Sequence, residues 1–137
     1  MGDRVRRVEY FYVTVADKPG EGAKVLSELR EAGVNLLAFS GFPEGRRAQL
    51  DFLPADSKAF RQVAKKARWK LVGPKKAFLI QGEDRVGAAA EILAKLAAAK
   101  INVTAFQAVV GCESCYGALL WVAPKDFNKA AKILGAE

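Results

Sequence analysis

Apolar positions along the chain alternate between the spacing of β-strands and the spacing of α-helices. Residues 8–15 are almost continuously apolar, which predicts a strand that is covered on both faces. Residues 21–32 place their apolar side chains on one face of a helix, and Gly33 is expected to end it. Residues 34–40 and 48–53 then predict two strands joined by a hairpin, the second with one wetter face.

The next segment completes a unit. Asp56 is expected to cap a helix that runs to about Ala67, and residues 69–72 predict a short fourth strand. Gly73 and Pro74 are expected to form a linker. The order β-α-β-β-α-β is typical of the ferredoxin-like α+β sandwich, an antiparallel sheet with its helices on one face.

The pattern then begins again. Residues 77–81, 101–110 and 116–122 predict strands, and residues 85–99 and 127–134 predict helices. No fourth strand follows, so the second unit is predicted to lack its last strand. Strand 77–81 would then have an unpaired edge, which we expect to be covered by the first unit or by another copy of the chain.

Polar residues and glycines recur between the halves at an interval of 67 positions. The pairs are Asp17 with Asp84, Gly20 with Gly87, and Asn35 with Asn102. Apolar residues can recur at the same interval by chance because all helices share one period, but helical periodicity does not explain the recurrence of Asp, Gly and Asn. The recurrence therefore indicates an internal duplication, with one repeat in residues 1–73 and a second, C-terminally truncated repeat in residues 74–137.

Composition narrows the possible functions. The chain has 137 residues and no histidine, which removes the commonest general base and the usual nitrogen ligand of metals. The two repeats leave no room for a catalytic domain, so we expect no enzyme, no catalytic residue, no metal site and no cofactor. The sequence has neither a signal-peptide core nor a membrane-length apolar stretch, which favours a cytoplasmic protein without membrane attachment.

The doubled β-α-β-β-α-β order resembles a tandem ACT domain from about residue 8 to residue 134. The motif that carries the resemblance is Asp17-Lys18-Pro19-Gly20 before the first helix, with Asn35 at the start of the second strand. The resemblance implies a non-catalytic regulatory protein, an allosteric sensor that binds an amino acid or a similar small metabolite. It also implies a homodimer or another homo-oligomer, or action on a partner protein, with the ligand held where two modules meet.

The resemblance marks ligand-binding positions at the loop between the first strand and first helix, and at the start of the second strand. These positions are Asp17, Pro19, Gly20, Glu21 and Asn35 in the first repeat, and Asp84, Gly87 and Asn102 in the second. Amides at a helix N-terminus can hold a carboxylate, Asp can pair with an ammonium group, and Asn can donate and accept. The alternative is structural, because Asp also caps helices, Gly forms turns and Asn closes loops. Val86 replaces the proline in the second repeat.

An RNA-binding ferredoxin-like sheet is an alternative function. The net charge is +7, and Tyr10, Phe11 and Tyr12 lie on a strand predicted to be central. The strands at 48–53 and 116–122, however, lack the Lys/Arg-Gly-aromatic pattern that supplies stacking rings. Nucleic acid is therefore not the expected partner.

A thiol-reactive or metal-binding module is the other alternative. Cys112 and Cys115 have the CxxC spacing, but they fall in the predicted hairpin and not at a helix N-terminus, where thiol pKa values are lowered. Two thiolates also make only half of a structural zinc site. The competing interpretation is a pair of incidental reduced cysteines in a loop.

Overall fold

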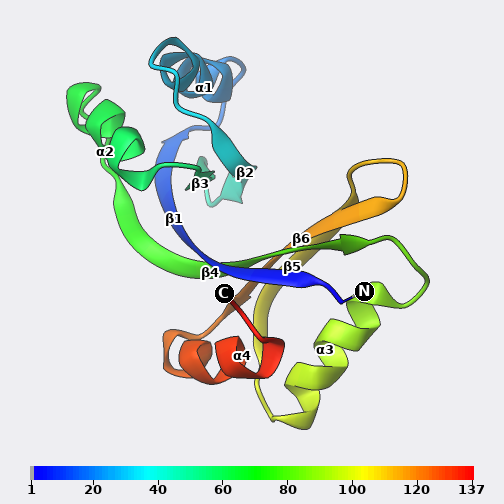
Figure 1. Ribbon diagram of the computed structural model, residues 1–137. Helices are drawn as coiled ribbons and strands as arrows, with labels where there is room; N and C mark the ends of the chain where they lie inside the picture. The colour runs from blue at the N-terminus through cyan, green and yellow to red at the C-terminus, as the bar shows by residue number, and fades with distance from the viewer. Residues whose placement is uncertain (1) are drawn as a thin grey trace. The chain divides into compact units, whose positions relative to one another are not determined.

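The structure is a computed structural model in which residues 2–137 are described (Figure 1). Strands and helices follow the predicted α+β order. They are β1 (Arg4–Ala16), α1 (Glu21–Glu31), β2 (Leu36–Glu44), β3 (Arg47–Pro54), α2 (Ser57–Lys66), β4 (Val72–Glu83), α3 (Ala88–Ala98), β5 (Val103–Val110), β6 (Cys115–Val122), a 3₁₀ turn η1 (Pro124–Asp126) and α4 (Phe127–Leu134). Within the described residues, no helix is both long and apolar enough to cross a membrane.

The strands hydrogen-bond in the order β2-β3-β1-β4-β6-β5. β1 and β2 both pair with β3 in antiparallel register, with Phe52 opposite Phe11 on one side and Phe39 on the other. β4 and β5 pair with β6 in the same way, with Ala118 opposite Ile80 and Ala108. The two halves of the chain therefore repeat one arrangement, as the duplication predicts.

The first repeat is a compact unit that comprises Glu9–Lys75. The buried side chains of its core cluster come from one face of β1 and β3 and from the inner faces of α1 and α2. They are Phe11, Val13, Val25, Leu29, Leu50, Phe52 and Phe60. The alternation along β3 explains this core, because Leu50 and Phe52 point to the same side of the strand.

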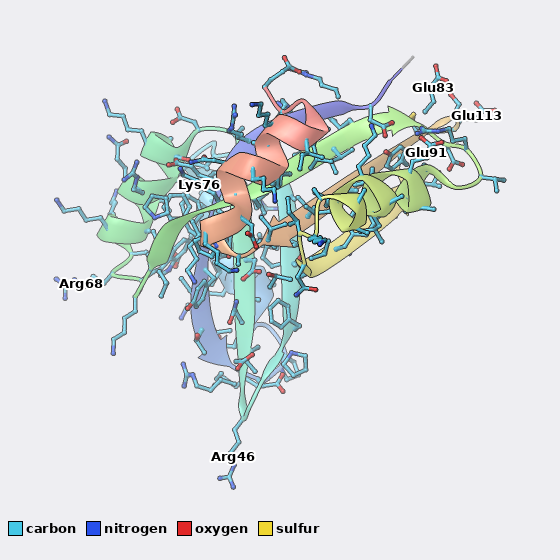
Figure 2. All side chains as sticks on the ribbon, turned by 90° about the horizontal axis from the view of Figure 1, so that it is seen from below. Arg46, Arg68, Lys76, Glu83, Glu91 and Glu113 are labelled. Atoms are coloured by element: carbon cyan, nitrogen blue, oxygen red, sulfur yellow. A yellow bond between two sulfur atoms is a disulfide. The ribbon has the colours of Figure 1, made fainter. Side chains whose placement is uncertain are left out.

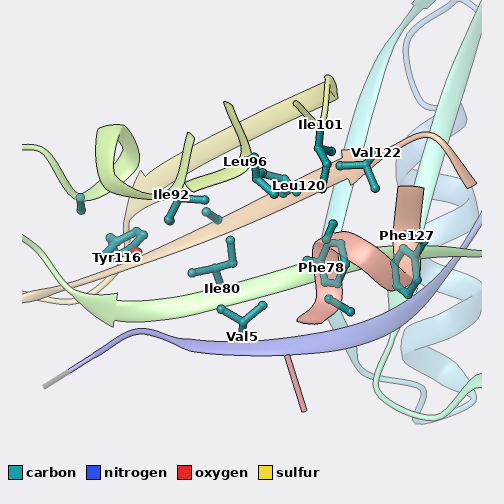
Figure 3. Packing of buried hydrophobic residues seen from close by; sticks show 14 residues of the cluster. Val5, Phe78, Ile80, Ile92, Leu96, Ile101, Tyr116, Leu120, Val122 and Phe127 are labelled. Atoms are coloured by element: carbon teal, nitrogen blue, oxygen red, sulfur yellow. The ribbon is translucent and has the colours of Figure 1, made fainter. Parts of the chain in front are cut away.

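The second repeat is a compact unit that comprises Lys76–Glu137 together with the residues before Glu9. Val5 of β1 is only 5% exposed and packs in one cluster with Phe78 and Ile80 of β4 (Figure 3). Backbone bonds fix the same segment, because the Glu137 amide donates to the Val5 carbonyl at 2.9 Å. In return, the Arg7 amide donates to the Glu137 carbonyl at 3.0 Å.

The start of β1 therefore supplies the strand that the second half of the sequence lacks. β1 and β4 are neighbours in the sheet, so the edge of residues 77–81 is covered by the chain's own N-terminal segment. Three arginines in residues 4–7 concealed this strand from the sequence prediction, which began at Val8. In an alternating strand, Arg4 and Arg6 lie on the face opposite to Val5, which faces the core.

Two predictions at the junction of the repeats are wrong. Residues 73 and 74 are not a linker, because they lie inside β4, and the fourth strand of the first repeat begins at Val72 instead of residue 69. Glycine and proline in sequence suggest a break, but one continuous strand passes through both and enters the two repeats in turn. The compact units change at Lys75 and Lys76, whereas the sequence placed one boundary after Gly73.

Candidate functional site

The helix that follows the first strand of each repeat begins with uncapped amides. Gly20 precedes α1 with φ 90°, and Gly87 precedes α3 with φ 86°, a backbone conformation that favours glycine. No side chain caps either helix, whereas Asp56 accepts hydrogen bonds from two amides at the start of α2. Asp17 and Asp84 are thus not helix caps, which removes one structural explanation for their recurrence.

A cleft of about 250 Å³ opens beside the start of α3 in the second repeat. One side is formed by the β4–α3 loop and the first turn of α3, and the other by the β5–β6 hairpin. The lining residues are Asp84, Arg85, Gly87, Ala88, Ala89, Ala90, Ala108, Val109, Val110 and Tyr116. The structure therefore brings two predicted positions, Asp84 and Gly87, to one cavity.

Backbone amides in this cleft are available to a ligand. The first intrahelical bond of α3 runs from the Glu91 amide to the Gly87 carbonyl, so the amides of Ala89 and Ala90 have no acceptor in the helix. No other atom lies within 4 Å of the point where a Cβ on Gly87 would stand. The helix start is therefore not filled by the protein's own packing, and its partial positive charge favours an anion.

The hairpin reaches the loop because both lie at the same end of their strands. Glu83, the last residue of β4, is opposite Cys115, the first residue of β6. The next amide, that of Asp84, donates to the Ser114 carbonyl at 3.0 Å. This bond joins the loop to the hairpin tip directly beside the cleft.

The guanidinium of Arg85, which lines the cleft, is already paired with two carboxylates of the protein. Arg85 donates to Asp3 at 3.2 Å and to Glu91 at 2.7 Å. These bonds, to Glu91 first and Asp3 second, raise the pKa of Arg85 and lower the pKa of Glu91. Burial alone would raise the pKa of Asp3, but the hydrogen bonds from Arg85 and Tyr116, together with the charges of Arg85 and Lys95, outweigh it and lower that pKa. Arg85 is therefore already neutralised within the protein.

Tyr116 closes the inner side of the cleft. It is 6% exposed and belongs to the core of the second repeat, near Ile92 (Figure 3). Burial, followed by the neighbouring Asp3 carboxylate, raises the pKa of Tyr116 to about 12. The phenol is therefore neutral at physiological pH. Three acidic residues, Glu83, Glu91 and Glu113, lie toward one end of the second repeat (Figure 2).

Asn35 and Asn102 do not lie near the predicted glycines of their own repeats. Ala16, the last residue of β1, is opposite Arg47, but Leu36, next to Asn35, is opposite Pro54. Seven residues of β3 separate these points, a distance of about 23 Å. In the second repeat Glu83 is opposite Cys115 and Val103 is opposite Val122, so the same number of residues along β6 separates Asn102 from Asp84 by about 23 Å. One small ligand cannot contact both ends of one repeat.

The remaining predicted positions lie at the matching loop of the first repeat. Asp17, Pro19 and Gly20 are exposed, and Glu21 is half-buried in the first turn of α1. No other atom lies within 4 Å of a Cβ placed on Gly20. This loop therefore presents the same open helix start as the second repeat.

The sequence interpretation missed the hairpin side of the cleft, namely Val109, Val110 and Tyr116, together with Arg85. Arg85 could have been included because it follows Asp84 in the recurring motif. The hairpin residues could have been found from topology, because the first strand of such a repeat ends beside the tip of its hairpin. Strand lengths counted from that end identify the facing residues.

Cys112 and Cys115 form a disulfide in the turn between β5 and β6. The expectation of two incidental reduced cysteines is therefore wrong for this state of the protein. Because the two sulfurs bond to each other, neither is a thiolate that could bind zinc.

No family profile and no curated protein sequence matches the chain. Solved structures do match it over almost its full length. Protein BT0572 from Bacteroides thetaiotaomicron has a TM-score of 0.81 at 15% identity, covering 97% of this chain and 88% of that one. The ligand-free regulatory subunit of aspartate kinase from Thermus thermophilus gives 0.66 at 15% identity, with 98% and 95% covered. The aspartokinase alpha and beta subunits give 0.66 at 19% identity, with 98% and 95% covered.

These matches confirm the predicted fold, which is that of tandem ACT domains. They cover 97% and 98% of this chain, so both repeats are included in the shared fold. At 15% to 19% identity the likeness concerns the fold and leaves the site to be argued from its own residues.

Proposed function

We propose that the protein is a non-catalytic regulatory module that binds a free amino acid in the cleft of its second repeat. The observation that carries this proposal is the uncapped start of α3, which faces a cavity of about 250 Å³. The regulatory role rests on the fold, because the aspartate kinase chains it resembles are regulatory subunits. We place the module in the cytoplasm, where amino acids are made and sensed.

The chemistry of the cleft fits a zwitterion. The amides of Ala89 and Ala90 would donate hydrogen bonds to the carboxylate of the ligand, because Arg85 is already paired with two carboxylates of the protein. Asp84 is exposed at the rim and would pair with the ammonium group. Alanine and valine side chains form most of the remaining lining, which favours a ligand with a small aliphatic side chain.

The test compares two substitutions on one helix. Ala90 lines the cleft, whereas Ala97 is exposed on α3 outside it. Ala90→Leu would fill the cleft, and Ala97→Leu is the control with the same chemical change, since leucine costs a helix little. A thermal-melt screen against single amino acids should find one that adds about 2.7 kcal/mol at 100 times its dissociation constant, a shift of several degrees.

The expected result is that Ala90→Leu removes the shift and Ala97→Leu retains it, with similar melting temperatures without ligand. Equal binding by both variants would place the ligand elsewhere, and the exposed loop of Asp17 and Gly20 would then be the next candidate. A screen in which no amino acid shifts the wild-type melt would reject the proposed function.

We further propose that the protein is a homodimer in which Asn102 acts on the cleft of the other copy. The support for this proposal is that Asn102 lies about 23 Å along β6 from Asp84, too far to reach the cleft of its own repeat. Mixing Ala90→Leu chains with Asn102→Ala chains should then restore binding, because the mixed dimer contains one site with both groups intact. If mixing restores nothing, Asn102 has no role across the dimer.

A further inference from the structure

The hairpin tip beside the cleft is a small cross-linked loop. The disulfide closes the turn from Cys112 to Cys115, and the Cys112 amide donates to Cys115 Sγ at 2.9 Å. Backbone bonds also hold the turn, from the Gly111 amide to the Cys115 carbonyl at 3.1 Å and from the Cys115 amide to the Cys112 carbonyl at 3.4 Å. Cys112 is exposed, so a thiol in solution can reach its sulfur.

This loop is continuous with one side of the cleft. Val110 lies two residues before Cys112, and Tyr116 directly follows Cys115; both line the cavity. Ser114, inside the cross-linked turn, provides the carbonyl that holds the Asp84 amide. The disulfide therefore fixes the two strands of the hairpin side and, through Ser114, the loop on the opposite side.

We propose that Cys112 and Cys115 are a redox modification site whose substrate is a dithiol, and that its oxidation state sets the affinity of the cleft. This inference rests on the proposed function for the ligand of the cleft and for the cytoplasmic location. In the cytoplasm, disulfides that do form are typically transient and redox-sensing. Because Cys112 and Cys115 lie beside the cleft, their oxidation or reduction can change how the cleft binds its ligand.

The reaction is thiol–disulfide exchange. A thiolate of the dithiol attacks Cys112 Sγ, the bond between the two protein sulfurs breaks, and Cys115 leaves as a thiolate that takes up a proton. The second thiol of the reductant then attacks the mixed disulfide and releases Cys112. The protein gains two electrons and two protons, and the dithiol becomes a cyclic disulfide. A disulfide oxidant reverses the same steps.

Reduction removes the cross-link and leaves the turn held only by its backbone bonds. The Ser114 carbonyl then has greater conformational freedom, and so does the Asp84 amide that donates a hydrogen bond to it. A ligand must order these groups when it binds the reduced form, so its affinity falls. We expect the oxidised protein to bind at least about fivefold more tightly, at the lower end of measured couplings between sites.

The first experiment titrates the amino acid found in the screen into the full-length protein, oxidised or reduced with dithiothreitol. A thiol count confirms each state. The double variant with Cys112→Ser and Cys115→Ser should bind like the reduced wild type and should not respond to dithiothreitol. Equal affinity in the two wild-type states, or a double variant that binds like the oxidised protein, would overturn the proposal.

The second experiment needs no ligand. Hydrogen exchange at the Asp84 and Gly111 amides should be slower in the oxidised protein than in the reduced protein or the double variant. The Lys24 amide, which donates to the Gly20 carbonyl in the first repeat, is the internal control and should not change. Unchanged exchange at Asp84 would refute the redox site even if the cleft binds a ligand. A change there without any ligand binding would refute the proposed function, and with it the control of ligand affinity, but it would leave the redox site itself in place.

Discussion

Replacing Val5 by alanine tests whether the start of β1 is a structural strand of the second repeat. Val5 lies at the other end of the sequence from most of that repeat, yet it is 5% exposed and packs against Phe78 and Ile80. Because of this packing, a change at the fifth residue should destabilise a unit built mainly from the last 62 residues, Lys76–Glu137.

The expected cost follows from burial. Val5→Ala removes two buried carbons, worth roughly 0.8 kcal/mol each when transferred out of water. A cavity between strand and core adds to this loss, because neighbouring side chains relax only in part. We therefore expect the free energy of unfolding to fall by about 2 kcal/mol. With a typical urea dependence of 1–3 kcal/mol per molar, the midpoint moves by roughly 1 M.

The two tryptophans provide an assay for each repeat. Trp69 packs in the core of the first repeat, and Trp121 lies on β6 of the second. Replacing either one by phenylalanine leaves a single fluorescent reporter. Urea unfolding followed by Trp121 should report the full loss in Val5→Ala, relative to the same background with Val5 intact.

Val109→Ala is the matched control, since Val109 is in the same repeat but 64% exposed, and it should change stability by less than about 0.5 kcal/mol. A loss below this limit for Val5→Ala would show that residues 4–8 are not part of the core. A loss seen by Trp69 and not by Trp121 would assign the segment to the first repeat instead.

Three further predictions concern single groups. Burial raises the pKa of Asp3, but the hydrogen bonds from Arg85 and Tyr116 and the charges of Arg85 and Lys95 outweigh it and hold that pKa below its usual 3.8. The contribution of Asp3 to stability is therefore present well above pH 3.8 and is lost as pH falls through the lowered value, so the stability gap between wild type and Asp3→Asn in urea unfolding should shrink from pH 7 to pH 3. Because the pKa of Tyr116 is raised from 10 to about 12, stability should fall as pH rises through that interval, and Tyr116→Phe should remove this loss in melts at alkaline pH. Lys100 has φ 60°, so Lys100→Gly should raise the free energy of unfolding by about 0.5 kcal/mol, since relief of roughly 1–2 kcal/mol exceeds the backbone entropy that glycine adds.

Periodicity and recurrence predicted the fold because both repeats keep their apolar faces through short, regular elements. The errors are at the ends of β1 and β4, the two strands that enter both repeats. The start of β1 was not predicted as a strand because it contains the charged residues Arg4, Arg6 and Arg7. The start of β4 was predicted to contain a linker because it contains Gly73 and Pro74. Local residue preferences cannot identify a strand whose pairing is decided by residues more than 60 positions away.

The candidate site was predicted on one side only. Recurring polar residues and glycines located the helix start, where Gly87 has a left-handed backbone and open surroundings. The residues across the cleft are Ala108, Val109 and Val110, ordinary apolar strand positions with no chemical mark of their own. Their role depends on which strand ends beside which loop, and that is a property of the sheet.

The two repeats differ most at the hairpin and least at the copied motif. In the first repeat β2 ends at Glu44 and β3 begins at Arg47, so two residues connect the strands. In the second repeat four residues separate Val110 from Cys115, and a disulfide closes the turn. The glycine helix start is the same in both, so it can supply carboxylate binding but cannot distinguish the repeats. The longer, cross-linked hairpin is therefore where we expect ligand selectivity and redox control to have arisen after the duplication.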